Sequence, residues 1–209
     1  MGMANLESGT KTKLLNAAIS VIRAQGYSAS TVDDICAAAG VTKGAFFHHF
    51  KSKEDLAVAA AAHWGAVTGG LFASAPYRAL HDPLDRVLAY VDFRKAILQG
   101  DLPEFTCLLG TMVQEAYETH PPIRNACDKY ISEHAAVVES DIAEAMRKYS
   151  TTAGWTAESL ALYTQAVIQG AFILAKAKHG PAVAAACIDH LRRYIELLFN
   201  QAETKEKTA

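Results

Sequence analysis

Helix caps, small residues and lysines follow one another closely between positions 31 and 56 of the chain. Thr31 is a suitable N-cap for a short helix, and Gly40 suits the left-handed residue that ends such a helix. Thr42 can cap a second helix, which opens with Lys43 and two small residues. A lysine and small side chains at the start of a helix let the chain approach phosphates and base edges. The spacing therefore predicts a helix-turn-helix that contacts DNA.

A dense sequence motif covers the same segment. Its residues are Thr31, Ile35, Ala39, Gly40, Val41, Thr42, Gly44, Phe47, His49, Phe50, Lys53 and Leu56. In this motif the chain resembles the TetR family of one-component transcriptional regulators, and the resemblance is sharp over residues 10 to 65. One position departs from the family pattern, because Phe47 stands where the family usually has tyrosine. A phenolic hydroxyl that could reach a phosphate is therefore missing.

The resemblance and the side-chain chemistry together identify the expected DNA contacts. These are Thr31, Thr42, Lys43, Gly44, Ala45, Phe47, His48, His49 and Lys53. We expect Thr42 to bind a phosphate and Lys43 a guanine edge or a phosphate; the alternative is that both only cap and solvate their helix. The resemblance implies phosphate contacts for Thr31 and Lys53. Since neighbouring residues on a helix point about 100° apart, His48 and His49 do not chelate one metal ion, and no metal site is expected.

Helical signals extend along the chain, and no segment alternates polar and apolar residues as a strand would. We expect an all-α fold of about nine helices, with one helix over residues 10–25, a loop over 73–82 and single helices over 83–98, 103–119 and 121–149. The expected organisation is a disordered N-terminus over 1–9, a DNA-binding domain over 10–55, a helical ligand-binding and dimerisation domain over 56–202, and a tail over 203–209.

Aromatic and soft side chains are frequent in the larger domain, where the resemblance implies a ligand pocket. The residues expected to line it are Trp64, Phe93, Phe105, Cys107, Met112, Tyr117, Tyr130, His134, Tyr163 and Phe172. Such side chains suit an apolar or aromatic effector, and each of them can instead be ordinary core. No cofactor is expected.

Cys107 has a second interpretation. The segment around it is similar to a motif in a TetR subgroup that includes repressors sensing electrophiles and oxidants. A position near a helix N-terminus can lower a thiol pKa and raise its reactivity. Packing in the core is the stronger explanation for a single cysteine in an apolar stretch.

The last two predicted helices are joined by the tight turn His179-Gly180-Pro181 and are apolar on more than one face. In the TetR family the equivalent helices form a four-helix bundle between two copies, and the resemblance implies a homodimer here. Gly170 and Ala171 would allow close helix approach, while Leu191, Tyr194 and Leu198 would fill the centre of the interface.

Composition excludes several other classes of protein. Hydrophobic residues make up 51% of the chain and charged residues 20%, as in a folded globular protein. The four cysteines are scattered, which argues against a disulfide framework or a zinc module. The net charge is -2, yet residues 42–53 contain three lysines and no acid, which suits a site-specific DNA binder. We expect no membrane span and no secretory signal, and hence a cytoplasmic protein.

These observations predict a homodimeric regulator that binds a near-palindromic double-stranded DNA operator. The favoured function is a repressor released by a small apolar or aromatic molecule, and the alternative is a thiol-based electrophile or redox sensor using Cys107. An activator is equally compatible with the sequence. A helical enzyme or metal-binding protein is the remote alternative, because the chain lacks a metal-ligand spacing, a phosphate-binding glycine loop and a nucleophile elbow; no catalytic residue is expected.

Overall fold

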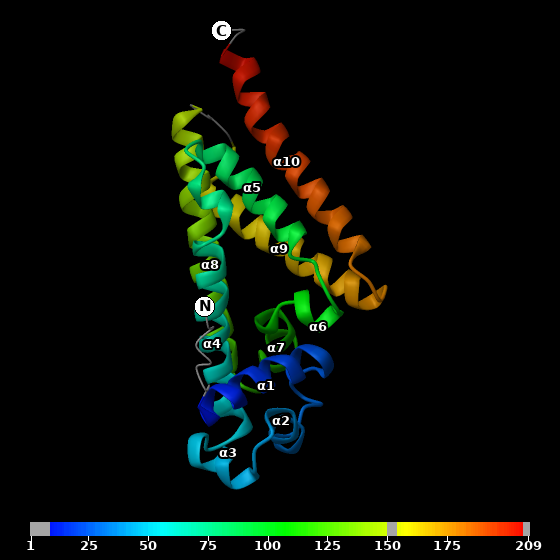
Figure 1. Ribbon diagram of the computed structural model, residues 1–209. Helices are drawn as coiled ribbons and strands as arrows, with labels where there is room; N and C mark the ends of the chain where they lie inside the picture. The colour runs from blue at the N-terminus through cyan, green and yellow to red at the C-terminus, as the bar shows by residue number, and fades with distance from the viewer. Residues whose placement is uncertain (1–8, 150–153, 207–209) are drawn as a thin grey trace, which may run out of the picture. The chain divides into compact units, whose positions relative to one another are not determined.

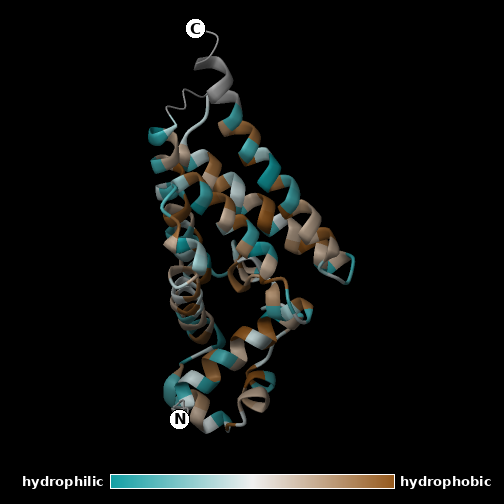
Figure 2. Cartoon of the chain, turned by 45° about the horizontal axis from the view of Figure 1, so that its top comes forward, coloured by the Kyte–Doolittle hydropathy of each residue, from teal (hydrophilic) through white to brown (hydrophobic). Residues whose placement is uncertain are grey.

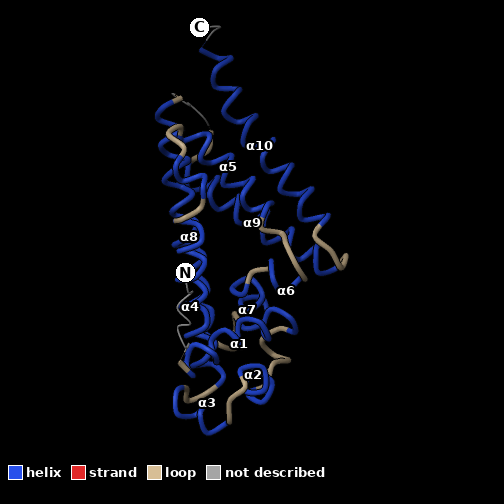
Figure 3. The backbone as a smooth tube through the Cα atoms, viewed as in Figure 1, coloured by secondary structure: helices blue, strands red, loops and turns tan. Residues whose placement is uncertain are grey.

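The computed structural model describes residues 9–149 and 154–206, with side chains described up to residue 200. Within these ranges all regular elements are helical (Figures 1 and 3), so the predicted all-α class is confirmed. The helices are α1 (Thr10–Gln25), α2 (Val32–Ala39), α3 (Lys43–His49), α4 (Lys53–Ala73), a short 3-10 helix (Pro76–Ala79), α5 (Pro83–Ala96), α6 (Leu102–Phe105), α7 (Leu108–Ala116), α8 (Pro121–Lys148), α9 (Ala157–Ala177) and α10 (Ala182–Glu206). Residues 1–8, 150–153 and 207–209, which include parts of both predicted tails, lie outside the described residues.

The helix caps predicted near the N-terminus are present. Thr31 and Asp34 form a capping box at the start of α2, in which each side chain accepts a hydrogen bond from the backbone of the other. Gly40 ends α2 in the left-handed conformation, with a φ of 64°. The hydroxyl of Thr42 caps α3 by accepting a hydrogen bond from the backbone N–H of Ala45 at 3.2 Å. These local interactions fix the turn between α2 and α3.

The chain divides into two compact units. The first unit comprises Met1–Thr68 and Cys107–Tyr130, and the second comprises Gly69–Thr106 and Ile131–Ala209. This division differs from the boundary expected at residue 55, because α7 and the beginning of α8 pack with the N-terminal helices. Helices α4 and α8 each contribute residues to both units.

The core of the first unit is formed where α1 packs against α2, α3 and α7. Its most deeply buried large side chains are Leu14, Ile22, Ile35, Phe46, Leu56, Leu108, Met112 and Ile123. Phe46 is completely buried and Phe50 almost so, and their rings lie 5.9 Å apart. They therefore anchor the middle and the C-terminal end of the short helix α3 in the core.

The region predicted as one helix over residues 103–119 is two helices. Thr106 and Cys107 between them have extended backbones, with ψ angles of 162° and 127°. The buried hydroxyl of Thr106 donates to the carbonyl of Leu102 at 2.8 Å and so closes the single turn of α6. Two smaller differences are the 3-10 helix within the predicted 73–82 loop and the extension of α10 to Glu206, into the predicted tail.

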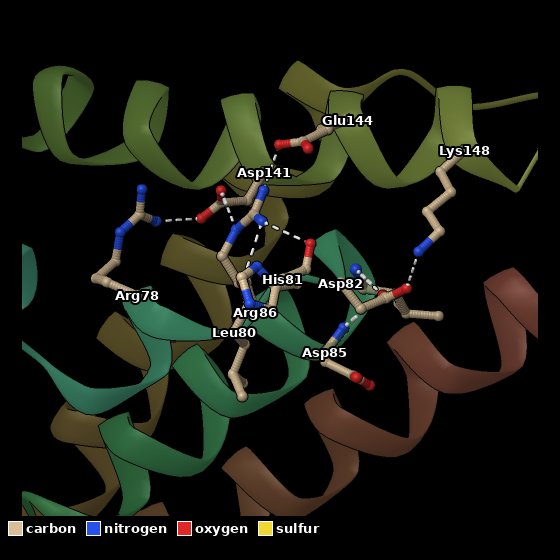
Figure 4. Close-up of polar contacts among 10 residues, drawn as sticks. Arg78, Leu80, His81, Asp82, Asp85, Arg86, Asp141, Glu144 and Lys148 are labelled. Atoms are coloured by element: carbon tan, nitrogen blue, oxygen red, sulfur yellow. Dashed lines mark hydrogen bonds and ion pairs between the residues drawn. The ribbon is translucent and has the colours of Figure 1, made fainter.

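In the second unit, α10 packs against α9 and α5, and ion pairs join α5 and the segment before it to α8 (Figure 4). The buried carboxylate of Asp141 accepts hydrogen bonds from Arg78 and from Nε of Arg86, the latter at 3.0 Å. Asp82 caps α5 and also accepts a hydrogen bond from Lys148. Burial alone would raise the pKa of Asp82, but these hydrogen bonds hold it well below its usual value.

Two helices are apolar enough to satisfy the length and hydropathy criteria for a membrane span, contrary to the expectation that none would. They are α4 and α9, of which 28% and 44% of the apolar window is buried within the chain. Core helices of soluble proteins satisfy the same criteria, so one or two such helices are weak evidence for a membrane. Several large apolar side chains of α9 are exposed. Along α10, hydrophobic and hydrophilic residues alternate in patches (Figure 2).

Candidate nucleic-acid interface

The exposed face of α3 carries most of the predicted DNA contacts. Thr42, Lys43, Gly44, Phe47 and His48 are exposed, whereas Ala45 and His49 are half-buried. Phe47 is an apolar ring with 57% of its surface exposed, and it packs edge-on against the buried ring of Phe46 at 5.0 Å. Buried phenylalanines thus fix the inner face of this short helix in the core, and its outer face exposes basic, small and aromatic groups. Such a helix can enter a major groove.

Lys43 forms an exchangeable ion pair. Its ammonium lies 2.8 Å from the carboxylate of Asp33, and both side chains are largely exposed, at 60% and 64%. The hydrogen bond from Lys43 to Asp33, together with the charge of Asp33, raises the pKa of the lysine, which is therefore fully protonated at neutral pH. Exposed pairs of this kind stabilise a fold very little. Lys43 can consequently exchange its carboxylate partner for a phosphate or a guanine edge at small cost.

The hydroxyl of Thr31 belongs first to the cap of α2. It donates to the carboxylate of Asp34 at 2.7 Å and accepts from the backbone N–H of the same residue at 3.1 Å. Thr31 is nevertheless exposed, so the second lone pair of its oxygen is accessible. A phosphate contact by Thr31 stays a prediction.

Lys53 makes internal contacts that the sequence did not indicate. Its ammonium donates to the backbone carbonyls of Tyr27 and Ser30, both at 2.9 Å, and lies 4.3 Å from the centre of the Tyr27 ring. Burial lowers the pKa of Lys53, and the charge of Glu115 opposes that effect. Two of the three ammonium donors are used inside the protein, where the lysine fastens the start of α4 to the α1–α2 turn. These internal contacts favour a structural role over the predicted phosphate contact, which stays a prediction.

The predicted run of three lysines over residues 42–53 therefore presents two outward charges, on Lys43 and Lys51. A further exposed lysine, Lys11 at the start of α1, places its ammonium 5.9 Å from the ring of Phe50 at the end of α3. The positive surface beside α3 thus includes a residue that the sequence motif does not contain.

Glu115 in α7 connects that helix to the same α1–α2 turn. Its carboxylate accepts a hydrogen bond from the backbone N–H of Ser28 at 2.7 Å. A Cβ atom at Gly26 would lie 2.3 Å from the Glu115 carboxylate, and the φ of Gly26 is 91°, so both space and backbone conformation favour glycine there. His120, just after α7, packs edge-on against Tyr27 with ring centres 5.2 Å apart. The α1–α2 turn, which leads into the first helix of the helix-turn-helix, is therefore in contact with α7 and the segment that follows it.

The ten residues predicted to line one ligand pocket are divided between the two units. Trp64, Cys107, Met112, Tyr117 and Tyr130 belong to the first, and Phe93, Phe105, His134, Tyr163 and Phe172 to the second. In the first unit Met112 is fully buried core, Tyr117 is 56% exposed, and Trp64 packs against the guanidinium of Arg23 at 4.6 Å. Met112 and Trp64 thus have structural roles that need no ligand, and Tyr117 is largely exposed.

Two of the predicted residues of the second unit, Phe93 and His134, belong to one aromatic cluster. Its rings are Phe72, Tyr77, Tyr90, Phe93 and His134. Phe105 and Phe172 form a separate pair of rings, with centres 6.3 Å apart. Tyr163 lies elsewhere, on the outside of α9, 45% exposed and 5.2 Å from the ring of Tyr194. The sequence interpretation missed the buried Arg94 beside this cluster. The spacing of Arg94 gave a signal, because positions 87, 91 and 94 lie on one face of α5, and the other two carry buried valines.

Cys107 is the N-cap residue of α7 and is half-buried. Cys127 of the same unit is fully buried, and its pKa is raised to about 12, chiefly by burial and secondarily by Cys107. Within the first unit the two thiols therefore lie close enough to influence each other.

Two of the predicted interface residues face the interior of their own chain. Ala171 in α9 and Leu191 in α10 are each 1% exposed, and α10 packs against both α9 and α5. This burial within the single chain disfavours a place for both residues in an intermolecular interface, and their assignment to it stays a prediction. Gly170 and Leu198 are half-buried, and Tyr194 is 43% exposed. The large apolar side chains that these helices do expose are Leu162, Tyr163, Ile173, Leu174, Tyr194 and Leu197.

Comparison with known proteins gives matches over both parts of the chain. Residues 14–60 match the family described as bacterial regulatory proteins, tetR family, and residues 83–200 match the C-terminal domain of LmrA/YxaF-like transcriptional regulators. The HTH-type transcriptional repressor KstR2 of Rhodococcus jostii is 44% identical over 50 residues, which is 24% of this chain and 24% of that protein. The uncharacterized regulator YxaF of Bacillus subtilis is 25% identical over 138 residues, covering 65% of this chain and 71% of YxaF.

Solved structures share the fold at low sequence identity. Regulatory protein TetR from Rhodobacter sphaeroides has a TM-score of 0.79 and 23% identity, covering 89% of this chain and 98% of that one. A cysteine mutant of the TetR family regulator CifR, complexed with 26bp double-strand operator DNA, has a TM-score of 0.74 and 18% identity, covering 87% and 94%. These likenesses concern the fold.

Proposed function

The chain belongs to the tetR family of bacterial regulatory proteins and is a DNA-binding transcriptional regulator, not an enzyme; from that premise we propose that it is a cytoplasmic, homodimeric repressor. A small apolar or aromatic molecule releases it from its operator. Curated relatives that are similar in the N-terminal region match over about a quarter of their length, 24% for KstR2, so their regulated genes and ligands are not transferred to this chain.

The observation that carries the proposal is the construction of α3. Buried Phe46 and Phe50 fix the helix, and exposed Thr42, Lys43 and His48 project from its other face. In a dimer, two such helices would enter successive major grooves about 34 Å apart. The DNA site is then a near-palindrome, since each half of the dimer reads one half-site.

The exposed apolar side chains of α9 and α10 support the dimer. Six large apolar residues on two adjacent helices are exposed in the single chain, including Tyr163 and Tyr194, whose rings touch. Large apolar side chains exposed together on adjacent helices are typical of a protein interface. Its pairing with a second copy brings two reading helices together.

Release by an effector requires a connection to the DNA-reading helices, and α7 supplies one within the first unit. The hydrogen bond from Ser28 to Glu115 ties α7 to the turn that Lys53 also holds. An effector that favours a different position of α7 would move this turn. Only a ligand with different affinity for the two states shifts the equilibrium between them.

The test is selection of DNA ligands from a random double-stranded library by the purified protein. We expect an inverted repeat with half-site centres about one helical turn apart, or a small multiple of that distance. Selection of a sequence without two-fold symmetry, or no enrichment, would contradict the proposal. Stoichiometry of two chains per repeat, measured by sedimentation, provides the check on the dimer.

Chemical modification of Cys107 is a second candidate signal. The observation that favours it is the position of this half-buried thiol at the first turn of α7, the helix that holds the α1–α2 turn. If it is the sensor, brief treatment with iodoacetamide releases the selected DNA from the wild type and from Cys187→Ser but not from Cys107→Ser. Equal release from both variants would eliminate this mechanism.

A further inference from the structure

Among the residues that the structure describes, the second unit contains a buried positive charge without a counter-ion. Arg94 in α5 is 9% exposed, and its Nε atom is buried with no hydrogen-bond partner in the described part of the chain. A guanidinium stays protonated at all physiological pH values. A buried charge is unfavourable unless an opposite charge or several hydrogen bonds compensate it. The placement of Arg94 therefore calls for a partner that the described chain does not supply.

Aromatic rings on two other helices flank the guanidinium. Its central carbon lies 5.2 Å from the ring centre of Phe72 in α4 and 5.8 Å from that of Phe172 in α9. Such contacts stabilise a cation through the ring faces. They leave the N–H at Nε of the guanidinium without a hydrogen-bond acceptor, since a ring face accepts no conventional hydrogen bond as a carboxylate does.

The polar groups near Arg94 are neutral. Burial, and secondarily the charge of Arg94, lowers the pKa of His134 to about 3, so this imidazole carries no charge at neutral pH. A nitrogen of His134 lies 2.9 Å from the hydroxyl of Tyr90, which also accepts a hydrogen bond from Gln165 at 3.2 Å. The three residues form a neutral hydrogen-bonded network beside the cation.

The buried acidic residue of the second unit that the structure describes, Asp141, is paired with other arginines. Its carboxylate binds Arg78 and Arg86. One carboxylate held by two arginines has no remaining charge to offer a third. The local balance is thus one positive charge, surrounded by aromatic rings and by neutral hydrogen-bonding groups.

We propose that Arg94 anchors the effector and that the effector is an aromatic monocarboxylate. The planar guanidinium matches a carboxylate through two parallel hydrogen bonds, and the flanking rings suit an aromatic body. A single cation accommodates a single negative charge. This inference rests on the proposed function, since it names the class of molecule that would release the regulator, and it adds a charge to the apolar ligand predicted from the aromatic residues alone.

The direct test compares an acid with its neutral amide. Isothermal titration calorimetry of the full-length protein, without DNA and near neutral pH, would use benzoate, 2-naphthoate and 2-naphthamide. We expect at least one acid to bind, and 2-naphthoate to bind at least about 10-fold more tightly than 2-naphthamide, because the amide loses the charge-assisted hydrogen bonds. Equal binding of acid and amide, or no binding of either acid, would overturn the proposal.

Variants separate anchoring from folding. Arg94→Met keeps the length of the side chain and should weaken 2-naphthoate binding about 10-fold or more, while Arg94→Lys should lie between it and the wild type. Arg147→Met, on an exposed position of α8, removes the same charge elsewhere and should bind as the wild type does. Without ligand, Arg94→Met should melt no lower than the wild type, because it removes an unpaired buried charge. A clearly lower melting temperature would mean that the protein itself supplies the missing partner, and would refute the proposal.

DNA binding is measured separately, so the two proposals fail independently. Sequence-specific DNA binding without acid binding refutes the anchoring role of Arg94 and leaves the regulator intact. Acid binding that depends on Arg94, in a protein that selects no DNA sequence, would refute the DNA-binding repressor and support the anchoring role of Arg94. Release of the selected DNA by 2-naphthoate from the wild type, but not from Arg94→Met, is the result expected if both hold.

Discussion

Replacing Lys53 by methionine should lower the unfolding free energy of the protein without lowering its affinity for DNA phosphates. The ammonium of Lys53 donates to two backbone carbonyls at 2.9 Å and lies over the Tyr27 ring. Hydrogen bonds to charged groups contribute about 1.5–3 kcal/mol each and an exposed cation–π contact about 0.5–1 kcal/mol. Because the side chain is only partly buried, water recovers part of this energy. The unfolding free energy should therefore fall by about 2–4 kcal/mol.

Urea denaturation followed by circular dichroism measures this change. With a slope of about 2–3 kcal/mol per molar urea, the midpoint should fall by roughly 1 M. The matched variant is Lys43→Ala, whose exposed ion pair with Asp33 predicts an unchanged midpoint, within about 0.5 kcal/mol.

For DNA affinity, we expect the larger effect from Lys43→Ala and little effect from Lys53→Met. In fluorescence anisotropy titrations with the selected DNA, Lys43→Ala should weaken binding and reduce the salt slope by about one unit for each phosphate that the lysine neutralises, whereas Lys53→Met should leave the slope unchanged. A Lys53→Met protein with wild-type stability and a reduced salt slope would show that Lys53 binds phosphate, and the reasoning from its internal hydrogen bonds would be refuted.

Three further outcomes are expected. Leu197→Glu, at a side chain that is 57% exposed, should give a folded monomer in sedimentation. Leu191→Glu, at a position that is 1% exposed, should unfold the chain. A stable wild-type monomer at micromolar concentration would contradict the proposed interface. Folding lowers the pKa of Asp82, so the stabilisation by its carboxylate is present above about pH 4 and is lost as the pH falls below that value. The Asp82→Asn protein should therefore be less stable than the wild type at neutral pH, but it should lose less stability on acidification. Urea midpoints at several pH values measure this difference. Gly26→Ala should cost about 1–3 kcal/mol, since its φ is 91° and the new Cβ would meet Glu115; an unchanged melting temperature would show that the turn adapts freely.

The sequence alone determined the DNA-reading part of this protein, because that part depends on local interactions. Thr31, Gly40 and Thr42 act on backbone groups within three or four residues, so their spacing is sufficient to place α2 and α3. The anchoring of α3 by Phe46 follows from helical periodicity in the same way.

Features that depend on distant segments could not be predicted this way. A lysine beside a DNA-reading helix suits a phosphate contact, and only the approach of the α1–α2 turn, 26 positions earlier in the chain, directs Lys53 inward. The break between α6 and α7 lies at the extended backbones of Thr106 and Cys107. Neither arrangement has a repeating pattern in the sequence.

The ligand and dimer surfaces were decided by tertiary structure for a related reason. Residues such as Leu191 and Met112 have the same apolar character whether they pack inside one chain, against a second copy or against a ligand, and burial alone distinguishes these cases. Periodicity could place Arg94 on the buried face of α5, but it could not show which charges surround it. Whether a buried cation is paired depends on carboxylates contributed by other helices, and their positions are set only when those helices pack together.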